Sequence, residues 1–206
     1  MNESMSSDNE PEEKINLIAL GNNEVGKTSF ILRYIENSFH NVYLTTVGID
    51  FQIKFITLPN KKIYKIYFYD TAGQEKFKTL SFNVVKYSDG IILIYDITNK
   101  LTFDSIPEWI DSINNIKDKD FPIILVGNKS DLDNKREVSK EDGENLAKQF
   151  GISFYEVSNK NGNNIEECCN NLINKIIKRK GELQKTDTNS KLSRSIHKNK
   201  NKKCEC

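Results

Sequence analysis

The sequence predicts an α/β fold of three layers, in which a six-stranded, mostly parallel sheet with one antiparallel edge strand lies between helices on both faces. Two observations support this prediction. Apolar runs of strand length alternate with segments of helical periodicity along most of the chain, which is typical of strands joined by crossover helices. A glycine-rich loop, residues 21–28, also lies directly between the first apolar run and the first amphipathic helical segment.

Each element has its own pattern. Strands are predicted at residues 15–20, 51–58, 63–69, 90–95, 123–126 and 153–157. The second and third strands flank Pro59-Asn60-Lys61, a turn signal that predicts an antiparallel hairpin. The fourth and fifth are apolar throughout, as central parallel strands are. Helices are predicted at residues 27–36, at residues 139–150 and around Cys168. A further helix is predicted to begin at Ser105 or Ile106, because Pro107 is tolerated only in the first turn of a helix.

The chain has 206 residues, of which 37% are hydrophobic, and this is enough for one domain with a core, predicted at residues 14–180. Residues 1–13 are polar and acidic without the apolar stretch of a secretory signal, and we expect them to be disordered. Residues 178–203 hold ten Lys or Arg against two acidic residues, although the whole chain carries only +1. An acidic body with a disordered basic tail, residues 181–206, argues against nucleic-acid binding and for contact with an anionic surface.

The loop at residues 21–28 reads Gly-Asn-Asn-Glu-Val-Gly-Lys-Thr, which is the G-x-x-x-x-G-K-[ST] pattern. Glycines let the backbone aim N–H groups at phosphate oxygens, the lysine reaches the outer phosphates and the hydroxyl binds Mg²⁺. The alternative is a glycine-rich turn without a ligand, which the strand-loop-helix context disfavours. The loop thus indicates a P-loop NTPase fold. Its predicted phosphate-binding residues are Asn23, Glu24, Val25, Gly26, Lys27, Thr28 and Ser29.

The segment Asn128-Lys129-Ser130-Asp131 follows the fifth predicted strand, at the sheet edge where an open α/β fold binds its ligand. A carboxylate only accepts hydrogen bonds, and guanine offers two adjacent donors where adenine offers no N1–H. Asp131 is therefore predicted to select guanine. A capped loop without this function is the alternative.

The segment Asp70-Thr71-Ala72-Gly73-Gln74 follows the third predicted strand. Asp70 stands where a carboxylate can hold Mg²⁺ directly or through water. Gly73 can bring its backbone N–H to a γ-phosphate, and Gln74 can both accept from and donate to a water and a phosphoryl oxygen. Gln74 is therefore the predicted catalytic residue.

Three strings, residues 47–51, 69–75 and 90–96, read VGIDF, YDTAGQE and GIILIYD, and with these motifs the chain resembles small GTPases of the Ras superfamily, specifically the Rab family. The resemblance covers about residues 14–180. It implies that Thr46 binds Mg²⁺ and senses the γ-phosphate, and that Phe39 lies against guanine. It also implies that Asn128 meets the base N7, that the stem of Lys129 lies along the ring, and that Ser158-Asn159-Lys160 places a backbone N–H at the base O6.

The chain departs from this family at several positions. Asn159 replaces the usual alanine, and the site is expected to survive if that side chain points outward. Glu24 places a carboxylate in the phosphate loop, at small cost if it faces solvent. The aromatic triad that displays the nucleotide state reads Phe51, Tyr69 and Val84, where the family usually has Phe, Trp and Tyr.

The chain ends in Cys204-Glu205-Cys206, which resembles the Cys-x-Cys ending of Rab proteins and implies geranylgeranylation of both thiols. Stable anchoring needs a second chain or a basic patch beside the first lipid, and this tail offers both. Metal chelation by the two cysteines is the alternative. By contrast, Cys168 and Cys169 recur on one apolar helical face and are predicted to fill the core.

These features together predict a lipid-anchored switch that binds GTP and GDP with Mg²⁺, hydrolyses GTP slowly and recruits effectors on the cytoplasmic face of an intracellular membrane while cycling with the cytosol. The resemblance further implies an exchange factor, a GTPase activator, an escort protein and a GDP-dissociation inhibitor as partners of a monomer. A guanine-nucleotide-dependent interaction module without hydrolysis is the main rival. A P-loop kinase is a second rival, which Asp131 disfavours.

Overall fold

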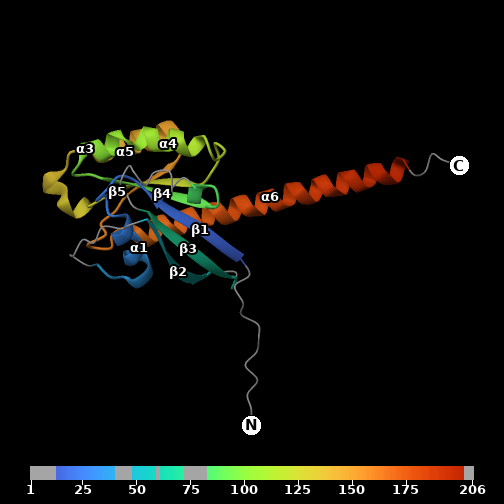
Figure 1. The fold of residues 1–206 in the computed structure, drawn as a ribbon, viewed down its shortest axis with the longest axis horizontal. Helices are drawn as coiled ribbons and strands as arrows, with labels where there is room; N and C mark the ends of the chain where they lie inside the picture. Colours follow the sequence, from blue (N-terminus) through green and yellow to red (C-terminus); the bar gives the residue numbers. More distant parts are fainter. Residues whose placement is uncertain (1–12, 40–47, 59–60, 72–82, 202–206) are drawn as a thin grey trace, which may run out of the picture.

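In the computed structural model, the described residues are 13–39, 48–58, 61–71 and 83–201, with the backbone alone from residue 184 onward. A six-stranded sheet has the order β2-β3-β1-β4-β5-β6 (Figure 1). The strands are β1 (Glu13–Leu20), β2 (Ile49–Thr57), β3 (Ile63–Thr71), β4 (Gly90–Asp96), β5 (Ile123–Asn128) and β6 (Ser153–Glu156). The helices are α1 (Lys27–Glu36), α3 (Lys100–Asp104), α4 (Ile106–Asn114), the 3-10 helix Ser130–Lys135, α5 (Lys140–Phe150) and α6 (Ile165–Asn201).

The strand pairings confirm the predicted fold class. Edge strand β2 runs antiparallel to β3, and every other neighbouring pair is parallel. The turn predicted at Pro59-Asn60-Lys61 falls partly outside the described residues, but the strands on either side pair from Ile49 with Thr71 to Thr57 with Ile63.

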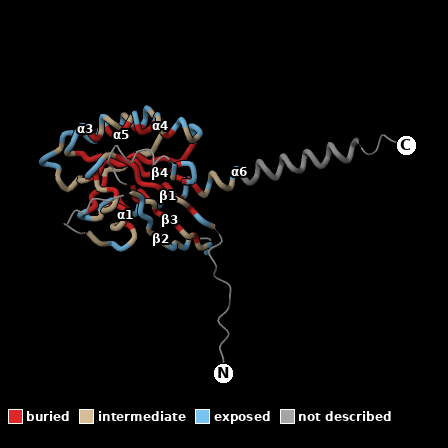
Figure 2. Tube along the Cα trace, in the orientation of Figure 1, coloured by how far each residue is buried: buried red, intermediate tan, exposed pale blue. Residues whose placement is uncertain are grey.

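Two hydrophobic cores lie on opposite faces of the sheet because successive strand side chains alternate. Ile15 and Leu17 of β1 pack with α1 and α6, while Ile18 and Leu20 pack with α4 and α5. The central strands are buried almost throughout (Figure 2). The result is the predicted three-layer arrangement, with α1 and α6 on one face and α4 and α5 on the other (Figure 1).

Cys168 and Cys169 belong to the first of these cores and are fully buried. Burial away from solvent raises the pKa of both thiols, so they stay protonated and unreactive. The prediction that they fill the core is confirmed.

The helical segment around Pro107 differs from expectation by being divided in two. Ser105 separates α3 from α4, and Pro107 stands in the first turn of α4, where its missing N–H costs nothing. The predicted start of a regular helix at Ser105 or Ile106 is confirmed, whereas α3 before it was not predicted.

The C-terminal segment also differs from expectation. Disorder was predicted from residue 181, but the backbone of α6 continues as a helix to Asn201 and extends away from the sheet (Figure 1). The helix contains no proline and only Gly181 as a glycine. Helical hydrogen bonds are local, so the backbone of this extension satisfies its own N–H and C=O groups without packing against the domain. The domain boundary near residue 180 stays a prediction.

Candidate functional site

The phosphate loop connects the buried end of β1 to the first turn of α1, and its backbone takes conformations that need glycine. Gly21 and Gly26 have φ values of 137° and 96°. A Cβ on Gly26 would lie 2.4 Å from Asn128 Nδ2, so this glycine also permits a close contact. The loop therefore turns directly into the positive end of α1, which favours an anion.

Lys27 is the charged centre of this loop. Its ammonium donates to the carbonyl oxygens of Gly21 at 3.1 Å and Asn22 at 2.7 Å. Burial lowers its pKa to about 8, and the nearby Asp70 carboxylate opposes this shift. A buried ammonium held by neutral carbonyls is a strong site for a phosphate, because a phosphate would restore the lost charge stabilisation.

Thr28 and Asp70 come together across the loop. The Thr28 hydroxyl donates to Asp70 Oδ2 at 2.5 Å, and Asp70, at the end of β3, is only 4% exposed. A hydroxyl and a carboxylate are hard oxygen donors of the kind that Mg²⁺ prefers. The two predicted metal ligands among the described residues thus fit Mg²⁺ in chemistry and in placement.

Glu24 and Asn22 take opposite roles in the loop. Glu24 is exposed, with φ 61°, so its carboxylate faces solvent. Asn22 points inward, and its Oδ1 accepts from Ser105 Oγ at 2.9 Å and from Trp109 Nε1 at 2.8 Å. This anchor to α4 was not predicted, and the sequence carries no signal that would have revealed it.

The loop after β5 lies directly against the phosphate loop. Asn128 is 1% exposed, and its Nδ2 donates to the Val25 carbonyl at 2.7 Å. Its Oδ1 accepts from the Asn159 backbone N–H at 3.3 Å. Asn128 therefore connects three segments that the sequence predicted to share one nucleotide.

Asp131 and Ser158 meet at the base side of the site. Ser158 Oγ donates to Asp131 Oδ1 at 2.6 Å, which fixes the carboxylate and leaves it further acceptor capacity. Lys129 has φ 69°, and its ammonium pairs with Asp96 Oδ2 at 2.6 Å. The ion pair orients the Lys129 stem beside the same loop.

The Asn159 side chain points inward, so the condition stated for the site to survive, an outward side chain, is not met. It is 4% exposed, and its Nδ2 donates to the Gly26 carbonyl at 2.9 Å. The amide turns inward because the phosphate-loop carbonyl provides a buried acceptor, and a buried polar group needs such a partner.

Arg33 of α1 is a functional residue that sequence reasoning missed. Its guanidinium donates to the carbonyls of Asn159 and Lys160, each at 2.7 Å, and lies 5.9 Å from the centre of the Phe39 ring. Arg33 thus holds the loop after β6 and the predicted base-stacking aromatic from one helix.

Residues 16–178 match the Ras family. The chain is 41% identical over 165 residues to Ras-related protein Rab-13 of Bos taurus, which covers 80% of this chain and 81% of that protein. It is 43% identical over 161 residues to Ras-related protein Rab-8B of Homo sapiens, covering 78% and 77%, and 37% identical over 182 residues to Ras-related protein Rab-3C of Bos taurus, covering 88% and 80%.

The chain is a Rab-family small GTPase. GTP hydrolysis is therefore its class of reaction. Several predicted residues of this Rab-family GTPase lie outside the described part of the chain, namely Thr46, Gly73, Gln74, Cys204 and Cys206.

The altered triad of this GTPase lies partly on the surface. The Phe51 side chain is 54% exposed, and its ring centre is 6.4 Å from that of Tyr69. Val84 is half-buried against the core that contains α4 and α5. Phe51 is therefore the most exposed member of the triad.

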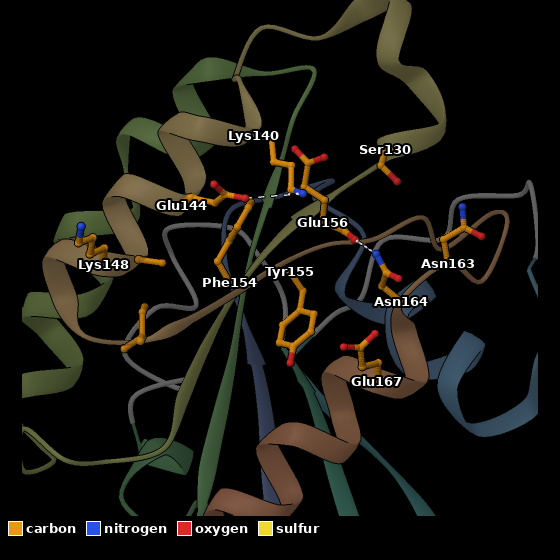
Figure 3. Close-up of a pocket in the computed structure, with 12 residues that line it drawn as sticks. Ser130, Lys140, Glu144, Lys148, Phe154, Tyr155, Glu156, Asn163, Asn164 and Glu167 are labelled. Atoms are coloured by element: carbon orange, nitrogen blue, oxygen red, sulfur yellow. Dashed lines mark hydrogen bonds and ion pairs between the residues drawn. The ribbon is translucent and has the colours of Figure 1, made fainter.

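A surface groove of about 530 Å³ lies beside the nucleotide loops of this GTPase, between α5, β6 and the start of α6 (Figure 3). Three of its charged residues have partners: Lys140 pairs with Glu144 at 3.6 Å, and Glu156 is bound by Arg136. The predicted phosphate-binding residues do not line it. The groove is therefore separate from the proposed nucleotide site.

Proposed function

We propose that this Rab-family GTPase is a membrane-anchored switch that binds GTP and GDP with Mg²⁺, hydrolyses GTP slowly and recruits effectors in vesicular membrane traffic. The bond from Asn128 Nδ2 to the Val25 carbonyl carries the proposal, because it holds the base-reading segment on the phosphate loop. A site that joins a phosphate-binding loop to a segment able to read the base suits a guanine nucleotide.

Base recognition rests on Asp131. Its carboxylate is positioned by Ser158 and would accept from the N1–H and N2 amine of guanine. Adenine would place an acceptor against this carboxylate and be rejected. Phe39 and the stem of Lys129 would cover the ring, and the backbone N–H of Asn159 would meet O6.

The phosphates would lie on the loop from Asn23 to Ser29, with Lys27 at the outer phosphates. Thr28, Asp70 and, in the GTP state, Thr46 would hold Mg²⁺, which neutralises developing charge on phosphate oxygens. Gln74 would orient the attacking water, and the backbone N–H of Gly73 would bind the γ-phosphate. Loss of that phosphate would release the segments that carry Thr46 and Gly73, which is the switch.

The rival function, a nucleotide-dependent interaction module without hydrolysis, depends on Glu24 and Asn159 having disturbed the site. Glu24 faces solvent, and the Asn159 side chain bonds to the phosphate loop. The solvent-facing Glu24 supports the hydrolysing switch, and the hydrolysis measurement below decides the effect of the inward Asn159 side chain.

Base choice tests the proposal first. We expect the parent to prefer GDP strongly over ADP, and Asp131→Asn to lose GDP affinity by about a hundredfold or more while gaining affinity for XDP, whose edge presents an acceptor in place of the amine. Competition binding with GDP, ADP and XDP measures this. A parent that prefers ADP would overturn the guanine assignment.

Hydrolysis is tested separately. Gln74 is present. The arginines whose side chains are described bind other groups: Arg33 binds the loop after β6, Arg136 binds Glu156 and Arg179 binds Asp118. With no arginine finger identified in cis, we expect an intrinsic rate of about 10⁻⁴ to 10⁻² s⁻¹. Gln74→Leu should slow single-turnover phosphate release at least about tenfold, because the water loses its orienting group. Equal rates in parent and variant would remove Gln74 from the mechanism.

The partners follow from the resemblance alone. We propose an exchange factor, a GTPase activator, effectors, an escort protein and a GDP-dissociation inhibitor, all acting on a monomer.

In the described part of the chain no helix has the length and hydrophobicity to span a bilayer. We propose that prenylated Cys204 and Cys206 attach the protein to the cytoplasmic face of an intracellular membrane.

A further inference from the structure

The side chain at position 159 forms a contact that the alanine usual in the family cannot form. The Asn159 Nδ2 donates to the Gly26 carbonyl at 2.9 Å, beside the bond from Asn128 Nδ2 to the Val25 carbonyl at 2.7 Å. Two carboxamides from two different loops thus bind consecutive carbonyls of the phosphate loop.

The remaining groups of Asn159 are also held. Its backbone N–H donates to Asn128 Oδ1 at 3.3 Å, and its carbonyl accepts from Arg33 Nε at 2.7 Å. Only Oδ1 has no hydrogen-bond partner among the described residues, and this atom is buried. The side chain therefore keeps its inward position, bonded to Gly26, while one of its acceptors stays without a partner.

The contact is tight as well as polar. A Cβ on Gly26 would lie 2.4 Å from Asn128 Nδ2 and 2.8 Å from Asn159 Nδ2. Both amides therefore pack directly on the bare Cα of this glycine, and the phosphate loop has little freedom to move away from the loop after β6 while they stay in place.

We propose that Asn159 is a positioning residue that ties the loop after β6 to the phosphate loop and slows the release of bound nucleotide. The inference rests on the proposed guanine-nucleotide function. The nucleotide would contact both loops. If the loops stay together, the base and phosphate contacts must break simultaneously, which makes release slow. If the loops separate, the base and the phosphates can be released one after the other.

Release of a fluorescent GDP analogue, measured by stopped flow in the full-length protein, tests this. Asn159→Ala removes the tie and restores the residue usual in the family. We expect release to become about three- to tenfold faster, the effect of losing one buried neutral hydrogen bond.

Asn159→Asp separates hydrogen bonding from packing. The carboxylate has the shape of the amide but cannot donate, so it would oppose the Gly26 carbonyl. We expect release at least as fast as in Asn159→Ala. A role in packing alone would instead leave Asn159→Asp close to the parent.

Asn163→Ala is the matched control, because Asn163 is an exposed asparagine in the same loop, and its release rate should equal that of the parent. If the parent binds GDP but Asn159→Ala and Asn159→Asp release it at the parent rate, the inference is overturned and the proposed function stands. If the parent binds no guanine nucleotide, both are overturned.

Discussion

Lys27 shows at the residue scale how the fold prepares an anion site at a cost to its own stability. Lys27 is 5% exposed, and its ammonium is bound to two neutral carbonyls. Its pKa of about 8, against an ordinary 10.5, means that the folded protein holds this proton less tightly than the unfolded chain does. The cost is present in full below pH 8, where both states hold the proton, and disappears by about pH 10.5, where the unfolded chain loses it as well.

We therefore expect the nucleotide-free parent to gain stability between pH 8 and pH 10.5 relative to Lys27→Met, which has no charge to bury. The gain in free energy of unfolding should be roughly 3 kcal/mol, because a tenfold difference in proton affinity between the folded and unfolded states corresponds to about 1.36 kcal/mol. Urea unfolding of both proteins across this range measures it. If the difference in unfolding free energy between the parent and Lys27→Met stays constant with pH, the buried charge at Lys27 is contradicted.

The sequence predicted the residues of the phosphate loop and of the base loop because each motif is local and follows a strand whose end lies at one sheet edge. It did not predict the bonds from Trp109 to Asn22 or from Arg33 to Asn159. Their partners are 87 and 126 residues apart, and only the packing of α4 and α1 brings them together. The inward turn of Asn159 depends on the same packing.

At the element scale, glycines set how closely helices approach the sheet. A Cβ on Gly143 of α5 would lie 2.4 Å from Phe154 Cζ and 2.7 Å from the Tyr95 hydroxyl oxygen. A Cβ on Gly90 of β4 would likewise lie 2.6 Å from Ile176 Cδ1 of α6. The sequence predicted these helices and strands from apolar periodicity, but periodicity does not give the distance between layers, so neither contact could be predicted.

Gly143→Ala and Gly181→Ala form a matched pair. Both glycines lie in helices, where alanine is intrinsically better by about 1 kcal/mol. Gly181 has no atom within 4 Å of an added Cβ, so Gly181→Ala should leave stability unchanged or slightly higher. Gly143→Ala should lower the free energy of unfolding by about 1–3 kcal/mol, because the helix must move off Phe154 and Tyr95. Thermal and urea unfolding of the three proteins measure this. Equal stabilities would show that α5 adjusts freely.

At the scale of the whole molecule, the basic residues and the cysteines proposed to carry lipid follow the nucleotide motifs in the sequence. The nucleotide loops lie at one edge of the sheet, whereas α6 extends away from it toward the C-terminus (Figure 1). Ten basic residues and both terminal cysteines lie from residue 178 onward. Membrane attachment and nucleotide binding should therefore be separable by mutation.

The variant Cys204→Ser/Cys206→Ser tests this separation. Each basic residue close to an anionic leaflet contributes up to about 1 kcal/mol, screened by salt. Two prenyl chains would contribute about 0.8 kcal/mol per buried CH₂, so lipid should dominate membrane residence. We expect the double variant to be cytosolic in cell fractionation while its GTP affinity equals that of the parent. Replacing the tail lysines by glutamine should instead redistribute the protein among membranes. A double serine variant that stays on membranes would show that an element other than the two thiols holds it there.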